Sequence, residues 1–272
     1  MRTPLWPARS RTLLDMALVT LPRSLAALGV AVASTVGPSQ FAVADLPPDL
    51  LPDLRMARLG DLQIETGDDG ERRLRFTAVI VNVGAGPMEA VGVLRGGEID
   101  GIVQRIQREG AAPREVPTDA QFYFSGDGHE HWHIRDMQAY RLERLDGVDT
   151  TAVSEKHGFC LWDNERASPA VPGGQRAAAF NCPESLDDGE VRMGLSVGWR
   201  DVYPASLPDQ FIDVSGLESG RYRLWAEADP ASPDRPNGWF AESDEANNLT
   251  WVDLDIDFDA GSVLVVGYGP SA

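Results

Sequence analysis

The sequence predicts an all-β protein, an antiparallel β-sandwich with long loops that is preceded by a signal peptide. Many short runs alternate apolar and polar residues, and clusters of Gly, Pro, Asn and Asp separate these runs. Helical periodicity is nearly absent after the first 44 residues, and a hydrophobic content of 43% is enough for a packed core. Short strands with turn signals between them are typical of a sandwich.

The N-terminal residues have the composition of a secretory signal. An apolar run at 24–37 follows four arginines and precedes Ala42–Ala44, which matches an A-x-A cleavage site. We therefore expect residues 1–44 to be a signal peptide, with Met16 as an alternative start, and residues 45–272 to form one secreted domain. A membrane anchor is the other interpretation, although the run is short for a bilayer span.

The predicted strands follow from the alternation of side chains. In residues 72–80 every second side chain is apolar, which indicates one buried face. A turn at 84–87 leads into a short strand at 91–94. Further strands are predicted at 121–124, 137–145, 191–197, 210–214, 221–228, 249–258 and 263–267. The stretch 163–190, rich in Asn, Pro, Gly and Ala, is predicted to be a long loop.

The mature chain would be strongly acidic. Removing residues 1–44 takes away four arginines and one aspartate, which leaves 20 basic and 41 acidic residues. Such a surface repels nucleic acid and attracts cations, including amines and basic peptides. Solubility alone is an equally good explanation of this charge.

The chain has two cysteines, Cys160 and Cys182. Export favours a disulfide between them, and closing a loop of about 20 residues would stabilise the fold by roughly 3 kcal/mol in the chain-entropy model. Thiolate ligation of a metal is the alternative, but two isolated cysteines lack the C-x-x-C spacing of such sites.

All four histidines fall within positions 129–157. Three of them alternate as His129, His131 and His133, and on a strand their side chains share one face. Neutral imidazole suits copper, zinc and iron, and three histidines with an open position favour a catalytic metal over a structural one. Because the outer pair would lie roughly 13 Å apart on a straight strand, we expect a distorted strand here.

These residues and several other segments resemble the lysyl oxidase family. His129–His133 is similar to the H-x-H-x-H copper motif of that family. The segment 156–161, which contains the only lysine of the chain, resembles the segment that carries the cofactor lysine of the family. The resemblance extends over roughly 49–252 and includes the segments 49–53, 201–203, 210–213 and 241–248.

The resemblance implies a copper-dependent amine oxidase whose cofactor, lysyl tyrosylquinone, forms from Lys156 and Tyr203. Such an enzyme uses molecular oxygen to convert primary amines, including lysine side chains of peptides, into aldehydes, peroxide and ammonia. Tyr123 is the alternative tyrosine because it is nearer in sequence to the histidines. We expect Lys156 and Tyr203 to lie far apart before they are joined, because the loop that carries Lys156 would have to move.

Two proton transfers are needed for this chemistry. Lys156 must lose a proton to become a nucleophile, and desolvation or a protonated His157 beside it would favour that loss. A carboxylate must remove a proton from the substrate carbon, and Asp244 is assigned this role, with Asp127 and Asp136 as alternatives.

Two other functions stay open at this point. In one, the chain is a non-catalytic extracellular sandwich whose histidines hold zinc or copper for stability. In the other, it carries copper or electrons without a quinone. Residues 242–248 and 81–86 also resemble hairpins of CARDB-type adhesion sandwiches, in which Asn and Asp satisfy turn backbone groups. Asn247 and Asn248 are therefore assigned a structural role.

Overall fold

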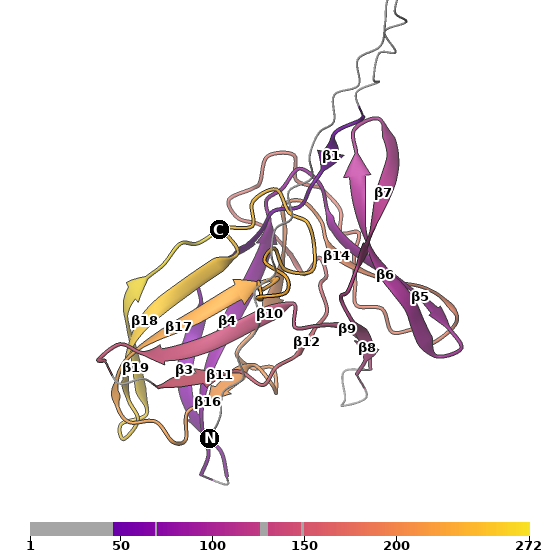
Figure 1. The fold of residues 1–272 in the computed structure, drawn as a ribbon. Coiled ribbons are helices and arrows are strands. Elements are labelled where there is room, and N and C mark those ends of the chain that lie inside the picture. The colour runs from indigo at the N-terminus through magenta and orange to yellow at the C-terminus, as the bar shows by residue number, and fades with distance from the viewer. Residues whose placement is uncertain (1–45, 69, 126–129, 148–149) are drawn as a thin grey trace, which may run out of the picture. The chain divides into compact units, whose positions relative to one another are not determined.

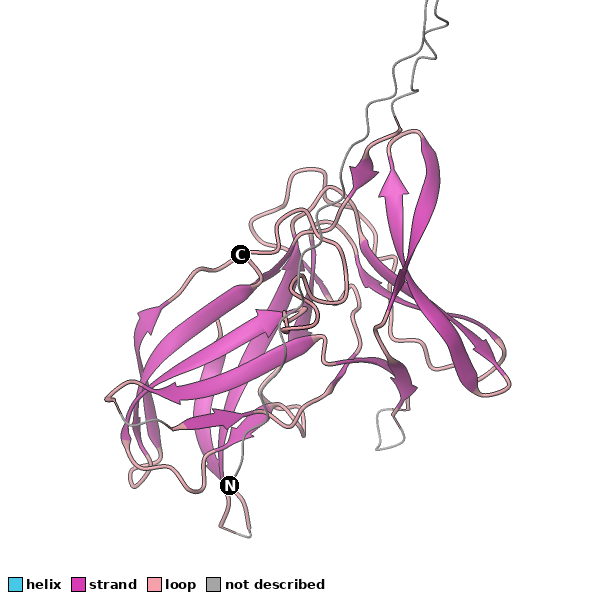
Figure 2. Cartoon of the chain, viewed as in Figure 1, coloured by secondary structure: helices cyan, strands magenta, loops and turns pink. Residues whose placement is uncertain are grey.

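Antiparallel strands make up the regular secondary structure of the described residues, 46–68, 70–125, 130–147 and 150–272 (Figure 1, Figure 2). The structure is a computed structural model, and Leu46–Ala272 forms one compact unit. The predicted all-β class is confirmed, and the predicted signal peptide lies outside the described residues. In the described part of the chain, no helix is long and apolar enough to span a bilayer.

One layer of the sandwich is a five-stranded antiparallel sheet in the order β11-β10-β17-β18-β19. Its strands are β10 (Gln138–Arg144), β11 (Thr151–Val153), β17 (Gly220–Ala228), β18 (Leu249–Asp257) and β19 (Ser262–Tyr268). Alternate residues of the central strand, including Tyr222, Leu224 and Ala226, are fully buried. Their partners across the strand pairs, Leu142 and Val252, are buried as well, so one face of this sheet is apolar.

The opposite layer is a six-stranded sheet built around β4 (Arg72–Asn82). Its other strands are β2 (Leu54–Met56), β3 (Gly60–Thr66), β13 (Glu165–Arg166), β15 (Trp199–Tyr203) and β16 (Phe211–Asp213). As predicted, every second residue of β4 from Leu74 to Ile80 is fully buried. Phe76 meets Tyr140 of the first sheet edge to face at 4.9 Å between ring centroids, so the two sheets enclose one core.

A second five-stranded sheet lies outside this sandwich. It runs β1-β6-β5-β14, with β7 paired to β6, and its strands are β1 (Asp49–Leu50), β5 (Met88–Arg95), β6 (Glu98–Arg108), β7 (Ala111–Thr118) and β14 (Gly189–Leu195). The buried side chain of Asn82 connects it to β4, because its amide nitrogen donates to the carbonyls of Gly86 and Leu195 at 3.0 and 2.8 Å.

A small sheet in the order β12-β9-β8 positions the candidate site. It consists of β8 (Phe122–Phe124), β9 (Trp132–Arg135) and β12 (Gly158–Phe159). The end of the histidine motif lies on β9, and β12 begins two residues after Lys156. The pairing of Phe159 with Ile134 therefore brings the lysine segment next to the histidines.

The predicted strands all correspond to strands of the structure, with bounds that differ by a few residues. The predicted loop 163–190 is interrupted by the two-residue β13 and ends where β14 begins. The sequence did not predict β1, β2, β3, β6, β7, β11, β12, β13 or β15.

Candidate functional site

The histidine motif departs from an ideal strand, as predicted. Glu130 has a positive φ of 46°, and regular strand structure begins only at Trp132. The rings of His131 and His133 meet edge to face with their centroids 4.6 Å apart, so both imidazoles occupy one small region. His129 lies outside the described residues, and its part in the ligand set stays a prediction.

Gly158 allows β12 to approach these side chains closely. A Cβ atom at this position would overlap the hydroxyl of Tyr123 and come within 2.9 Å of Nδ1 of His133. Only glycine fits here without displacing them, and its backbone therefore forms one wall beside His133.

Most of the predicted site residues line one cavity of about 520 Å³. His131, His133, Lys156 and Tyr203 all contribute to its wall. Tyr123, the alternative tyrosine, instead packs on His133 with ring centroids 5.4 Å apart and is not among the described residues that line the cavity.

Lys156 and Tyr203 lie close together. The side chain of Lys156 is only 4% exposed, and its Nζ is 5.7 Å from the ring centroid of Tyr203 and 5.2 Å from that of Phe159. The expectation that Lys156 and Tyr203 lie far apart is therefore wrong for this structure. The expectation failed because the loop that connects β11 to β12 turns toward the interior. It already places the amine of Lys156 beside the ring of Tyr203.

The charged neighbour of Lys156 is an anion. Its Nζ forms an ion pair with Oδ2 of Asp209 at 2.6 Å. His157, the cation expected beside Lys156, has an exposed side chain that bonds through Nδ1 to Oδ1 of Asp136 at 2.6 Å. Successive residues of an extended segment point to opposite sides, which explains why His157 faces away from Lys156.

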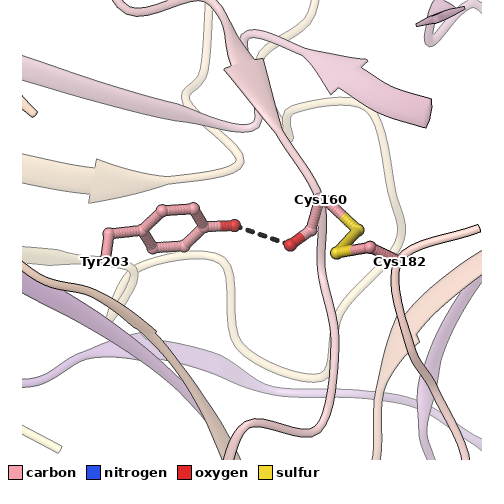
Figure 3. Close-up of a disulfide and its surroundings, with 3 residues drawn as sticks. All are labelled: Cys160, Cys182 and Tyr203. Atoms are coloured by element: carbon pink, nitrogen blue, oxygen red, sulfur yellow. Dashed lines mark hydrogen bonds between the residues drawn. A yellow bond between two sulfur atoms is a disulfide. The ribbon is translucent and has the colours of Figure 1, made fainter. Parts of the chain in front are cut away.

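The predicted disulfide joins Cys160 and Cys182 and lies beside Tyr203 (Figure 3). The hydroxyl of Tyr203 donates to the backbone carbonyl of Cys160 at 2.8 Å. A nitrogen of His131 and the two sulfur atoms lie within 4.8 Å of one another. Because these sulfurs are bonded to each other, they are not thiolates, and the alternative of thiolate metal ligation is wrong for this oxidised form.

Replacing both cysteines, as in Cys160→Ser with Cys182→Ser, is expected to lower the free energy of unfolding by about 3 kcal/mol, since the disulfide closes a loop across a sequence separation of 22 residues. Urea denaturation of the variant and of wild type measures the difference. Reduced wild-type protein should match the variant. An unchanged midpoint would show that packing alone holds the loop.

Asp201 is a carboxyl group that the sequence motif contained but that was given no role. It is fully buried on β15, two residues before Tyr203, so both side chains lie on the same face and line the cavity. Neither of its oxygens has a hydrogen bond of ordinary geometry to a described residue. Burial raises the pKa of Asp201 well above its usual range.

The structure does not bring Asp244 to this cavity. Asp244 is exposed in the turn before β18, where its Oδ1 accepts a hydrogen bond from the amide of Ala246 at 3.0 Å. Of the alternatives, Asp136 is bonded to His157 and Asp127 lies outside the described residues. Nearby, the buried amide of Asn248 donates to Glu242 at 2.9 Å, which agrees with a structural role for Asn248.

The family model for lysyl oxidase matches residues 102–266, which is more than half of this chain. Protein-lysine 6-oxidase of Homo sapiens is 27% identical over 154 residues, covering 56% of this chain and 32% of that protein. Lysyl oxidase homolog 2 of Xenopus tropicalis is 27% identical over 147 residues, covering 53% of this chain and 17% of that protein. The match thus spans about a third or less of the length of these relatives. The chain belongs to the lysyl oxidase family.

Proposed function

We propose that this chain is a secreted, copper-dependent amine oxidase that converts primary amines into aldehydes and releases hydrogen peroxide and ammonia. The observation that carries the proposal is the single cavity in which two motif histidines, the only lysine and Tyr203 meet. The printed names of the relatives, which include protein-lysine 6-oxidase, support the reaction class. The signal-like composition of residues 1–44 supports export.

The residues of the cavity fit both copper and a quinone cofactor. His131 and His133 offer imidazole nitrogen, a donor that suits copper, and His129 would complete the set. The amine of Lys156 and the ring of Tyr203 are the two halves of lysyl tyrosylquinone, and they are already neighbours. Once present, copper and this quinone would supply an acceptor for the electrons of the amine and a route for those electrons to dioxygen.

Asp201 is the proton acceptor in this proposal, in place of Asp244. Its carboxyl group lies on the same strand face as Tyr203, where an amine bound at the ring would present its neighbouring carbon. Burial raises its pKa, so this carboxylate is a stronger base than that of an exposed aspartate. Val202, Pro204 and Leu207 line the cavity with apolar atoms, which would limit the water around this transfer.

The rim of the cavity favours a cationic substrate. Trp162 and Glu184 line the cavity and are both exposed. An indole face and a carboxylate each attract an ammonium group before it enters. We therefore assign cationic primary amines, including lysine side chains of peptides, as the substrate class.

Loading the purified protein with copper in air tests the proposal. We expect quinone absorbance, a covalent link between the peptides that contain Lys156 and Tyr203, and peroxide release when a primary amine such as benzylamine is added. In His133→Ala, copper affinity should fall at least about a hundredfold, and all three signals should be lost. The matched control is His157→Ala, because His157 points to solvent and should leave copper binding unchanged.

A wild-type protein that binds copper and gains thermal stability from it, yet forms no link between the two peptides, would contradict the proposal. That result would favour the non-catalytic sandwich in which the histidines hold a structural metal. A protein that binds copper without stability gain, quinone or amine-dependent oxygen uptake would favour the copper-carrying module instead.

A further inference from the structure

The loop that follows Tyr203 carries a carboxylate back to Lys156. Residues 204–210 fold into consecutive turns, in which the amide of Leu207 donates to Pro204 and that of Gln210 donates to Leu207. This short, internally bonded loop ends with Asp209 and Gln210, and β16 follows it. The ring of Tyr203 and the carboxylate of Asp209 are therefore two ends of one structural unit.

Arg75 of β4 fixes this loop to the sandwich. Its guanidinium donates to the carbonyl oxygens of Ala205 at 3.2 Å, Leu207 at 2.8 Å and Pro208 at 3.4 Å. A planar guanidinium that binds several carbonyls from a rigid strand restricts the loop in more than one direction. Asp209, the next residue after Pro208, is thereby held in place.

The lysine loop is fixed from the other side by Ser154. Its hydroxyl donates to the carbonyl of Phe211 at 2.9 Å and accepts a hydrogen bond from the amide of Lys156 at 3.2 Å. Phe211 is the first residue of β16, so the same strand that follows Asp209 also anchors the loop of Lys156. The two loops are tied to one another independently of the ion pair.

The ion pair between Lys156 and Asp209 is a further direct contact between these two loops. The ammonium group is buried under the rings of Phe159 and Tyr203, whereas the side chain of Asp209 is 40% exposed. Only Oδ2 of the carboxylate is engaged, at 2.6 Å, and the shielded Oδ1 has no hydrogen-bond partner among the described residues. Asp209 thus lies between the buried amine and solvent, with one carboxylate oxygen on the amine.

We propose that Asp209 is a positioning residue for cofactor formation, which holds the Lys156 amine beside the Tyr203 ring and takes the proton that the amine must release before it bonds to that ring. This inference rests on the proposed function, because it concerns the origin of the quinone. It assigns Asp209 no part in the turnover of substrate.

The joining reaction balances with two molecules of dioxygen. The first inserts one oxygen atom into the phenol ring, giving a quinone, and its second oxygen atom leaves as water. The lone pair of Nζ then forms the N–C bond, after the ammonium proton has passed to Asp209. The second dioxygen removes two electrons and two protons from the product ring and leaves as hydrogen peroxide. Copper and dioxygen are the co-reactants that the proposed function already requires.

Labelling of the single lysine tests the position of the amine without copper. N-hydroxysuccinimidyl acetate is added to the apoprotein, and the acetylated peptide that contains Lys156 is quantified by mass spectrometry over time. We expect labelling at least about tenfold faster in Asp209→Asn than in wild type, because a charge-assisted hydrogen bond no longer holds the amine. Asp209→Glu should restore slow labelling. Equal rates in Asp209→Asn and wild type would overturn the inference.

The rate at which the link between Lys156 and Tyr203 forms after copper is added in air tests whether Asp209 takes the proton of the amine. Asp209→Asn should form the link at least about tenfold more slowly, with a rate that rises with pH as solvent replaces the missing acceptor. Asp209→Glu should recover most of the rate. The matched control is Asp213→Asn, whose carboxylate accepts hydrogen bonds from the amide and the hydroxyl of the nearby Ser215. A variant Asp209→Asn that joins as fast as wild type would overturn the role.

The two tests separate this inference from the proposed function. If wild-type protein never forms the link, the proposed function and the role of Asp209 in joining both fail. The labelling rates would still decide whether Asp209 holds the amine, since they need neither copper nor quinone.

Discussion

The variant Lys156→Arg is expected to form no lysyl tyrosylquinone and to lose amine oxidation by at least about a thousandfold, a loss of the size seen when a covalent catalytic group is removed. The guanidinium stays protonated in proteins and does not act as a nucleophile, so it will not bond to the Tyr203 ring. It still carries a positive charge and can pair with Asp209, so the surroundings keep their electrostatic balance. Peroxide release with benzylamine and mass spectrometry of the two peptides measure the result.

A matched pair of tyrosine variants controls for indirect effects. Tyr203→Phe removes the hydroxyl that bonds to the Cys160 carbonyl and should also abolish the link. Tyr123→Phe removes the other phenol near the histidines and should form the link at a rate near that of wild type. Peroxide release that survives in Lys156→Arg, or a link formed by Tyr123, would contradict the assignment of these two residues.

The predictable parts of the fold are the strands whose side chains alternate between a solvent-exposed face and a buried face. β4 is such a strand, and its buried residues were assigned from the sequence alone. β7 was missed because most of its side chains are exposed, and its alanines, prolines and charged residues do not alternate between apolar and polar. β6 was missed for a different reason. Its buried Gln104 breaks the pattern, and the backbone of Ala241 satisfies that amide at 2.8 Å.

The parts of the site that were predictable are those with unusual residue types. The histidine cluster and the only lysine are conspicuous in the sequence, and the disulfide follows from a chain with two cysteines. Asp201 was recoverable in principle, because a residue two positions before a tyrosine on a strand shares its face. Asp209 was not, since it lies 53 residues after Lys156 and depends on a loop that Arg75 holds. Sequence separation of this size leaves no local pattern to detect.

The variant Asp201→Asn is expected to lower kcat/KM for a primary amine by about 10²–10⁴-fold, the usual range for loss of a general base. Asparagine keeps the shape of the side chain but cannot accept the proton. Burial raises the pKa of Asp201, so wild-type kcat/KM should increase with pH on the acid side as this carboxyl loses its proton. The variant should lack that increase. Quinone absorbance measured in the same samples shows whether the cofactor has formed.

Stability against pH gives an independent check on the same group. Because the folded pKa is raised above the ordinary value of 3.8, the folded state holds this proton more tightly than the unfolded state does. Its contribution to stability is therefore full below about pH 3.8 and is lost as pH rises through the folded pKa. Asp201→Asn should then be at least as stable as wild type at neutral pH, with an advantage that disappears in acid. A variant that is less stable than wild type at neutral pH and equally active would show that Asp201 supports the fold and is not the base.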